Sequence, residues 1–191
     1  MKKGNKKIPS NKPNELLACF DDNGNEIESS PRQEVHSTPL NIWHGVASVW
    51  LLDSYGEILC SKRSPYAEGN PNKWQTYFGG HIKEGRDFLS TIKREIKEEV
   101  GLDISEDKII LVDSGKREDV MHIYKNYAVL FEGDLSEFNF ADGEVAAARW
   151  FSFNKYQKQR DENPNKWCNS IKPDQYYKAI NALNIRCNHF L

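Results

Sequence analysis

The chain has 191 residues, of which 38% are hydrophobic and 12% aromatic, which is enough for an ordinary buried core and excludes a wholly disordered protein. Its 26 basic and 28 acidic residues leave a net charge of −2, so no overall positive field would attract nucleic acid. No apolar run reaches the roughly 20 residues that a membrane-spanning helix requires, and no apolar stretch follows the basic start as in a secretory signal.

The two ends of the chain differ in composition from its middle. Residues 1–13 are rich in Lys, Asn and Pro, and we expect a flexible, solvated basic tail, with contact to a polyanion such as RNA as the alternative. Residues 14–191 are expected to form a single domain with a C-terminal helical extension. The cysteines are widely spaced and form no C-x-x-C pair, which favours reduced thiols and a cytoplasmic location; they are Cys19, Cys60, Cys168 and Cys187.

In chain order, the first half predicts extended segments joined by turns and loops. The apolar or β-rich segments are 16–20, 46–52, 57–63 and 74–82. The connections expected between them are a turn at 21–25, a loop at 31–39, a turn at 53–56 and a surface loop at 64–73. Because a four-residue turn separates 46–52 from 57–63, these two segments are predicted to pair as a hairpin. Adjacent glycines at 79 and 80 indicate a sharp turn or a close approach of the backbone.

The segment 87–100 has the clearest helical pattern in the chain. Asp87 is a suitable N-cap, Gly101 follows the last turn, and an apolar residue recurs on one face at positions 89, 92, 96 and 100. Later segments expected to be strands are 109–112, 122–132 and 147–151, and those expected to be helices are 153–159 and 174–183. Strands flanking one central helix, with another helix at the end, predict an α/β sandwich on a mixed sheet.

Three glutamates cluster on the predicted helix, namely Glu95, Glu98 and Glu99. At about 100° per residue they fall in one arc beside the apolar face, at spacings where like charges repel. One interpretation is a solvated face whose repulsion is relieved by neighbouring basic residues. The other is a site for Mg²⁺ or Mn²⁺, which binds oxygen ligands and would cancel the repulsion.

The order of residues around this helix resembles the Nudix box, G-x5-E-x7-R-E-U-x-E-E-x-G-U, in which U is aliphatic. The pattern starts at Gly80, and residues 94–102 read R-E-I-K-E-E-V-G-L. Every fixed position matches except the first glutamate, where this chain has Arg86. The resemblance covers about residues 16–150 and implies the Nudix α/β/α sandwich, with a central mixed sheet and the Nudix loop–helix.

The resemblance also implies a chemistry for individual residues. Glu98 and Glu99 would be the main metal ligands, Glu95 a ligand or general base, and Arg94 would orient a glutamate through a charge-assisted bond. Glu144 lies where some members of the family place a further ligand or base. The family hydrolyses nucleoside or other organic diphosphates by attack of water at phosphorus, with Mg²⁺ or Mn²⁺ neutralising phosphate oxygens. The implied partner is therefore a small-molecule diphosphate.

Within the family, the N-terminal part resembles isopentenyl-diphosphate isomerase and the isomerase-like Nudix hydrolases. The matching stretches are 22–25, 32–36, 43–50, 62–65 and 73–74, and His36, His44 and His81 match the metal-binding histidines of the isomerase. The isomerase also needs a cysteine before its Gly-His pair, where this chain has Gly79, and acids on a middle strand, which 123–127 lacks. Protonation at carbon requires such an acid–base pair, so the sequence favours a hydrolase.

Two alternatives remain beside the hydrolase: the isomerase itself, and a low-activity or non-catalytic module that binds nucleotide or RNA. The second arises because Arg86 would place a cation beside the metal site and weaken metal binding. Asp87 or Glu84 would then have to supply the missing carboxylate. We expect neither a membrane nor a nucleic-acid partner for the hydrolase, and leave a homodimer open.

Substrate contacts are less clearly marked by the sequence. Lys62, Arg63 and Lys83 flank the expected cleft and are candidate phosphate contacts, although each is also compatible with a solvated charge. Candidate stacking partners for a base are aromatic residues that are equally compatible with ordinary packing; they are Trp43, Trp74, Tyr77 and Trp167.

Overall fold

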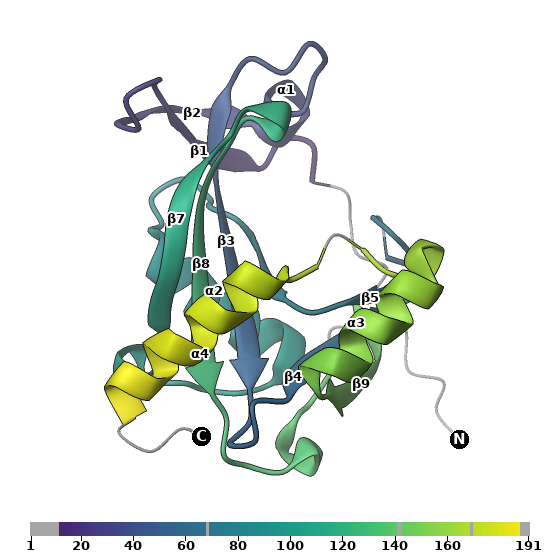
Figure 1. Cartoon of the computed structure of the whole chain (residues 1–191). Helices are drawn as coiled ribbons and strands as arrows, with labels where there is room; N and C mark the ends of the chain where they lie inside the picture. The colour runs from purple at the N-terminus through teal and green to yellow at the C-terminus, as the bar shows by residue number, and fades with distance from the viewer. Residues whose placement is uncertain (1–11, 68, 141–142, 169, 188–191) are drawn as a thin grey trace, which may run out of the picture.

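The computed structural model describes residues 12–67, 69–140, 143–168 and 170–187, with side chains described up to residue 184 (Figure 1). The predicted tail therefore lies outside the described residues as far as residue 11, and so does the side chain of Cys187. Cys19, Cys60 and Cys168 are free thiols, as the spacing predicted. No helix in the described part of the chain combines the length and apolar character needed to cross a bilayer.

The described residues form one nine-stranded mixed sheet with helices on both faces. The strands are β1 (Leu16–Phe20), β2 (Glu26–Pro31), β3 (Trp43–Leu52), β4 (Ile58–Arg63), β5 (Trp74–Gln75), β6 (Phe78–His81), β7 (Ile110–Arg117), β8 (His122–Leu130) and β9 (Val145–Phe151). The α-helices are α1 (Arg32–Val35), α2 (Phe88–Val100), α3 (Phe153–Glu162) and α4 (Pro173–Cys187). Short 3-10 helices lie between these elements, at Glu106–Lys108, Glu118–Val120, Leu135–Glu137 and Pro164–Lys166.

Strand β3 is the centre of the sheet. It runs parallel to β8 from His44↔His122 to Leu52↔Leu130, and antiparallel to β6 from Val46↔His81 to Val49↔Phe78. Because both edges of β3 are occupied, the predicted hairpin pairs only at Leu52↔Ile58, and β4 then pairs with β9 and β5 instead. The hairpin prediction was therefore correct for the turn and wrong for the extent of pairing.

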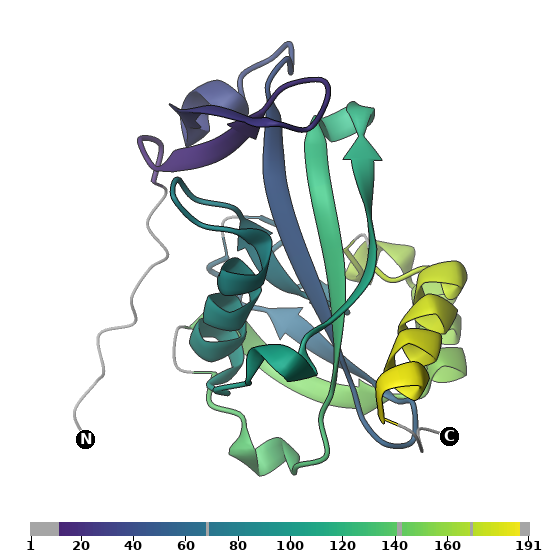
Figure 2. The same cartoon turned by 90° about the vertical axis from the view of Figure 1, so that its left-hand side faces the viewer.

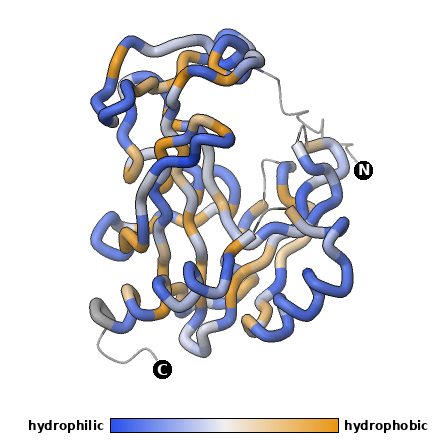
Figure 3. The backbone as a smooth tube through the Cα atoms, turned by 45° about the horizontal axis from the view of Figure 1, so that its top comes forward, coloured by the Kyte–Doolittle hydropathy of each residue, from blue (hydrophilic) through white to orange (hydrophobic). Residues whose placement is uncertain are grey.

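Strand β3 contributes side chains to the hydrophobic cores on both faces of the sheet, since successive side chains of a strand point to opposite faces. One core contains Ala47, Val49 and Leu51 with the apolar face of α2, and the other contains Trp50 and Leu52 with residues of α3 and α4. Figure 2 shows α2 on one side of the sheet and α4 on the other, and Figure 3 shows hydrophobic residues gathered along the strands between them. The predicted α/β/α sandwich is confirmed.

Some elements differ from the sequence prediction. The loop expected at 31–39 contains the short helix α1, and β2 comes from a polar, partly exposed segment with no hydrophobic alternation. Strand β7 extends to Arg117 rather than ending at Val112, because its polar half, from Asp113, pairs with β8. Pairing with a neighbouring strand, rather than local sequence, makes this segment extended.

Both ends of α2 follow their predicted signals. The Asp87 carboxylate accepts a hydrogen bond from the Ser90 backbone N–H at 2.8 Å. Gly101 adopts a left-handed conformation with φ of 79°, and its N–H donates to the Lys97 carbonyl. The two caps therefore define where α2 begins and where it ends.

Replacing Asp87 by Ala should lower the free energy of unfolding by about 1 kcal/mol at neutral pH, because the cap is lost. Hydrogen bonding from Ser90 lowers the pKa of Asp87, so the cap contributes fully above the unfolded-state pKa of about 4 and is lost as pH falls through the lower folded-state value. Denaturant titrations should show the difference between wild type and Asp87→Ala shrinking in acid. Asp87→Asn, which keeps a capping oxygen, is the control; a loss as large as that of Asp87→Ala would contradict the account.

Candidate active site

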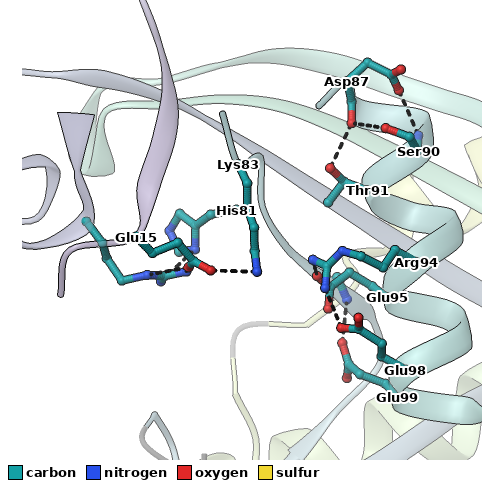
Figure 4. Close-up of polar contacts among 12 residues, drawn as sticks. Glu15, His81, Lys83, Asp87, Ser90, Thr91, Arg94, Glu95, Glu98 and Glu99 are labelled. Carbon is teal, nitrogen blue, oxygen red and sulfur yellow. Dashed lines mark hydrogen bonds and ion pairs between the residues drawn. The ribbon is translucent and has the colours of Figure 1, made fainter. Parts of the chain in front are cut away.

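A cavity of about 680 Å³ opens where β6 faces the carboxylate side of α2. Its walls come from segments far apart in the sequence: Glu15 before β1, α1 with His36, the loop after β4, β6, Lys83, α2 and Glu144. Figure 4 shows Glu15 and Lys83 on one side, and Arg94 with the three glutamates of α2 on the other. The cavity therefore has a carboxylate wall and a wall that carries cations.

The carboxylate wall is organised by Arg94. Its guanidinium forms ion pairs with both Glu95 and Glu98, and its side chain is only 18% exposed. Glu99 is buried, and its carboxylate accepts a hydrogen bond from the Gly79 backbone N–H at 3.2 Å. The structure thus places Glu95 and Glu98 in the cavity lining, with Glu99 held against β6 behind them.

The carboxyl group of Glu95 is affected both by burial and by the charges around it. Burial raises its pKa, and the nearby charges of Glu98 and Glu144 add to the rise, whereas Arg94 and Lys83 oppose it. Gly80 permits this arrangement, because a Cβ there would lie 3.1 Å from a Glu95 carboxylate oxygen. The Glu95 carboxylate, with the neighbouring carboxylates of Glu98 and Glu144, offers the oxygen ligands that a hard divalent cation such as Mg²⁺ or Mn²⁺ binds.

Arg86 lies outside this arrangement. Its side chain is exposed and does not line the cavity, while its backbone N–H donates to the Lys83 carbonyl at 3.1 Å and closes the turn before α2. Asp87 caps the helix and Glu84 is exposed, so neither places a carboxylate in the cavity lining. The geometry does not support the expectation that Arg86 holds a cation beside the carboxylates.

Arg86→Glu should therefore leave Mg²⁺ affinity unchanged within about twofold, because solvent screens charges at exposed positions. Lys83→Glu is the matched comparison: its charge lies in the cavity and acts on Glu95, so reversing it should alter Mg²⁺ affinity clearly. Calorimetric titration of the three proteins with Mg²⁺ measures both effects. A large gain of Mg²⁺ affinity in Arg86→Glu would instead show that residue 86 contributes to the metal site.

The predicted substrate contacts divide into two groups. Lys83 and Arg63 line the cavity, whereas Lys62 does not. The Arg63 guanidinium donates to the Gly69 carbonyl and to Gln75, which fixes it at the rim.

None of the predicted stacking aromatics lines this cavity. Trp43 donates its indole N–H to Asp22, Trp74 and Trp167 pack together against Phe151, and Tyr77 lines a separate cavity on the α4 side.

Three histidines meet beside the same cavity. The ligand nitrogens of His36, His44 and His81 all lie within 4.8 Å of one another, and the Nε2 atoms of His36 and His81 are 3.1 Å apart. Burial lowers the pKa of His44 to about 4 and that of His81 well below its usual value, so both rings are neutral at pH 7. His44 Nε2 is buried and has no hydrogen-bond partner among the described residues. Three imidazoles gathered around the unpartnered Nε2 of His44 offer nitrogen ligands that suit a divalent transition metal.

Sequence reasoning missed two residues of the cavity as functional candidates. Glu15 forms ion pairs with both Lys83 and Arg32, and Arg32 in turn lies 3.3 Å from His81 Nδ1. Glu15 precedes a short strand and shows no motif of its own. Arg32 fell in a stretch that resembles the isomerase, but no role was drawn from it. Only the pairing of β1 with β2 and β3, and the bridge Leu17↔Lys83, brings these residues to the cavity.

The positions that the isomerase uses for proton transfer are occupied differently. Gly79 has φ of +145°, and a Cβ there would lie 2.2 Å from the Ala47 carbonyl oxygen, so the backbone excludes a cysteine without movement. On β8, the buried Asn126 donates to Asp113 of β7 at 2.6 Å. Strand β8 carries no acid, as the sequence indicated.

A comparison with family models matches residues 43–168 to the NUDIX domain. An isopentenyl-diphosphate Delta-isomerase of Mycolicibacterium vanbaalenii is 32% identical over 108 residues, which cover 56% of this chain and 58% of that protein. An uncharacterized Nudix hydrolase of Clostridium acetobutylicum is 32% identical over 115 residues, which cover 59% and 53%. The matches thus span a little over half of the length of these relatives.

Solved structures show the same fold at low identity. DR0079 from Deinococcus radiodurans has a TM-score of 0.66 at 17% identity, covering 88% of this chain and 99% of that one. A bifunctional NMN adenylyltransferase/ADP ribose pyrophosphatase from Francisella tularensis, complexed with AMP and a manganese ion, has a TM-score of 0.52 at 17% identity, covering 82% and 45%. These similarities concern the fold alone.

Proposed function

The chain belongs to the Nudix family, and from this premise we propose that it is a metal-dependent pyrophosphohydrolase acting on a nucleoside diphosphate derivative or another organic diphosphate. The observation that carries the proposal is the cavity in which Arg94 holds Glu95 and Glu98 opposite Lys83 and Arg32. Such a cavity can bind a diphosphate between a metal held by carboxylates and cationic side chains.

We assign the metal to the carboxylate wall. Glu98 and Glu95 would hold Mg²⁺ or Mn²⁺, with Glu99 behind them and Glu144 in the same cavity lining. When bound, the metal supplies charge neutralisation at phosphate oxygens and acidifies the attacking water. Arg94 fixes the two carboxylates in orientation. Glu95 would either bind the metal or accept the proton of the attacking water as a general base.

The cationic wall would bind the phosphate oxygens that the metal leaves free. Lys83, Arg32 and Arg63 all line the cavity, and their donors suit anionic oxygens. The histidine cluster is a second candidate metal position with a different donor set. It favours a transition metal over Mg²⁺, so tests of activity should include Mn²⁺ and Zn²⁺ as well as Mg²⁺.

The isomerase is the second candidate, with one observation that favours it and one that opposes it. A relative named as the isomerase shares 32% identity with this chain, which keeps the activity under consideration. However, Gly79 and Asn126 supply neither a thiol nor a carboxyl group for proton transfer at carbon.

The experiment is a substrate screen with the purified full chain. The panel contains nucleoside di- and triphosphates, nucleotide sugars including ADP-ribose, dinucleoside polyphosphates and prenyl diphosphates, each with Mg²⁺, Mn²⁺, Zn²⁺ or EDTA. We expect metal-dependent cleavage of at least one diphosphate linkage, abolished by EDTA. Deuterium exchange into isopentenyl diphosphate without phosphate release would support the isomerase instead. Metal-dependent nucleotide binding with no cleavage across the panel would support a non-catalytic module.

A further inference from the structure

Glu15 stands at the junction of the two cationic side chains that face the α2 carboxylates. One carboxylate oxygen, Oε1, lies 2.6 Å from Lys83 Nζ, and the other, Oε2, lies 2.8 Å from Arg32 Nη2 and 3.2 Å from Arg32 Nε. The Glu15 side chain is only 13% exposed. Figure 4 shows the Glu15 carboxylate directed to Lys83 and lying away from Arg94 and Glu95.

The backbone holds the same three residues together. The Arg32 N–H donates to the Glu15 carbonyl at 2.8 Å, and Leu17 and Lys83 form an isolated antiparallel bridge. Each cation therefore has its main chain anchored next to Glu15 and its side chain directed to the Glu15 carboxylate. Burial raises the pKa of Glu15, but hydrogen bonds from Lys83 and Arg32 outweigh it and lower the pKa, so the group is ionised at neutral pH.

The charges of this cluster act across the cavity. Lys83 lowers the pKa of Glu95, and Glu15 raises that of Arg94, so the two walls lie within electrostatic range of each other. Two cations with one carboxylate leave a net positive charge at this wall. Long cationic side chains lose considerable freedom when they bind a ligand, and a carboxylate that orders them beforehand reduces this cost.

We infer that Glu15 is a positioning residue that holds Arg32 and Lys83 ready to bind the phosphate oxygens of a diphosphate. This inference rests on the proposed function, because it takes the cavity to be the substrate site. It assigns Glu15 no contact with the substrate. Its effect is to fix two donors at the wall opposite the metal-binding carboxylates.

The test measures binding of methylenediphosphonate, a pyrophosphate analogue that is not hydrolysed, in the presence of Mg²⁺ by calorimetry. Charge alone predicts that Glu15→Gln tightens binding, because a negative charge is removed beside an anion site. Positioning predicts the opposite sign, with affinity lowered about tenfold as the donors lose their fixed geometry. Glu28→Gln removes the same charge from an exposed site on β2 and should change affinity less than about twofold.

Further variants separate positioning from a general loss of structure. Glu15→Asp keeps the charge, but its carboxylate lies one methylene group farther from the two cations. We therefore expect an intermediate loss of affinity. If Glu15→Gln does not fold, the Glu15→Asp protein provides the test. Circular dichroism and thermal melting establish folding for each protein. In a Lys83→Met background, the effect of Glu15→Gln should become smaller, because one of the two positioned donors is gone.

The outcomes distinguish this inference from the proposed function. Folded Glu15→Gln with unchanged or tighter binding overturns the inference, whether or not the substrate screen finds hydrolysis. Wild-type protein that hydrolyses a substrate but does not bind the analogue also overturns the inference and leaves the function standing. Weaker binding in Glu15→Gln and Glu15→Asp, together with no hydrolysis of any substrate, supports the inference and rejects the hydrolase.

Discussion

Glu98→Gln should lower the rate of metal-dependent hydrolysis by about a thousandfold or more, because a metal site contributes several kcal/mol to stabilisation of the transition state. Glu98 lines the cavity, and its ion pair with Arg94 sets its orientation. Gln keeps the shape of the side chain but loses the charge that would hold Mg²⁺. Glu99→Gln should have a comparable effect, since Glu99 is the buried carboxylate behind the same position.

Folding should be affected far less than activity by Glu98→Gln. The Glu98 side chain is 54% exposed, and exposed ion pairs contribute little to stability. The measurement combines initial rates over a range of Mg²⁺ concentrations with thermal melting of the metal-free proteins. Glu106→Gln, at an exposed acid that lies outside the cavity, is the matched control and should retain wild-type rates. Full activity in the Glu98→Gln/Glu99→Gln double variant would contradict the assignment of the metal site to the α2 carboxylates.

Gly79→Ala should lower the free energy of unfolding by about 3 kcal/mol or more, through backbone strain combined with a steric clash. The φ angle of +145° is one that residues with a Cβ rarely adopt, and the added Cβ would meet the Ala47 carbonyl oxygen at 2.2 Å. Relief requires β6 to move away from β3, which would disturb the hydrogen bond between the Gly79 N–H and Glu99. Denaturant titration measures the loss.

Gly69→Ala is the control for that experiment. Gly69 also lines the cavity, but its added Cβ would meet no atom within 4 Å, so stability should change by less than about 0.5 kcal/mol. Gly79→Cys should be destabilised like Gly79→Ala and should not gain proton exchange at carbon. Wild-type stability in Gly79→Ala would mean that β6 accommodates a side chain, and would strengthen the isomerase alternative.

The parts of the fold that were predicted well are those set by local sequence. The N-cap at Asp87, the left-handed Gly101 and the apolar face between them fix α2 almost to the residue. Strand β3 was recognised from its β-branched and aromatic residues, but its partners were not. The parallel pairing of β3 with β8 joins residues about 80 apart in the sequence, and no local pattern encodes it.

The candidate site shows the same division. The three glutamates and Arg94 belong to one helix, so their spacing alone places them together. Glu15, Arg32 and the histidines reach the cavity from segments that only long-range strand pairing joins. The effect of Arg86 stayed open in the sequence for a related reason: the motif gives its position along the chain, but the turn before α2 exposes its side chain.

The most direct test of the hydrolase is the fate of water oxygen. The best substrate of the screen is incubated with the full chain and Mg²⁺ in water enriched in ¹⁸O, and the products are analysed by mass spectrometry. Attack of water at phosphorus predicts one ¹⁸O atom in one phosphate-containing product of each turnover, and a far slower formation of this labelled product by Glu98→Gln. Product formation without ¹⁸O at phosphorus, or formation of labelled product by Glu98→Gln at the wild-type rate, would contradict a pyrophosphohydrolase that uses the α2 carboxylates.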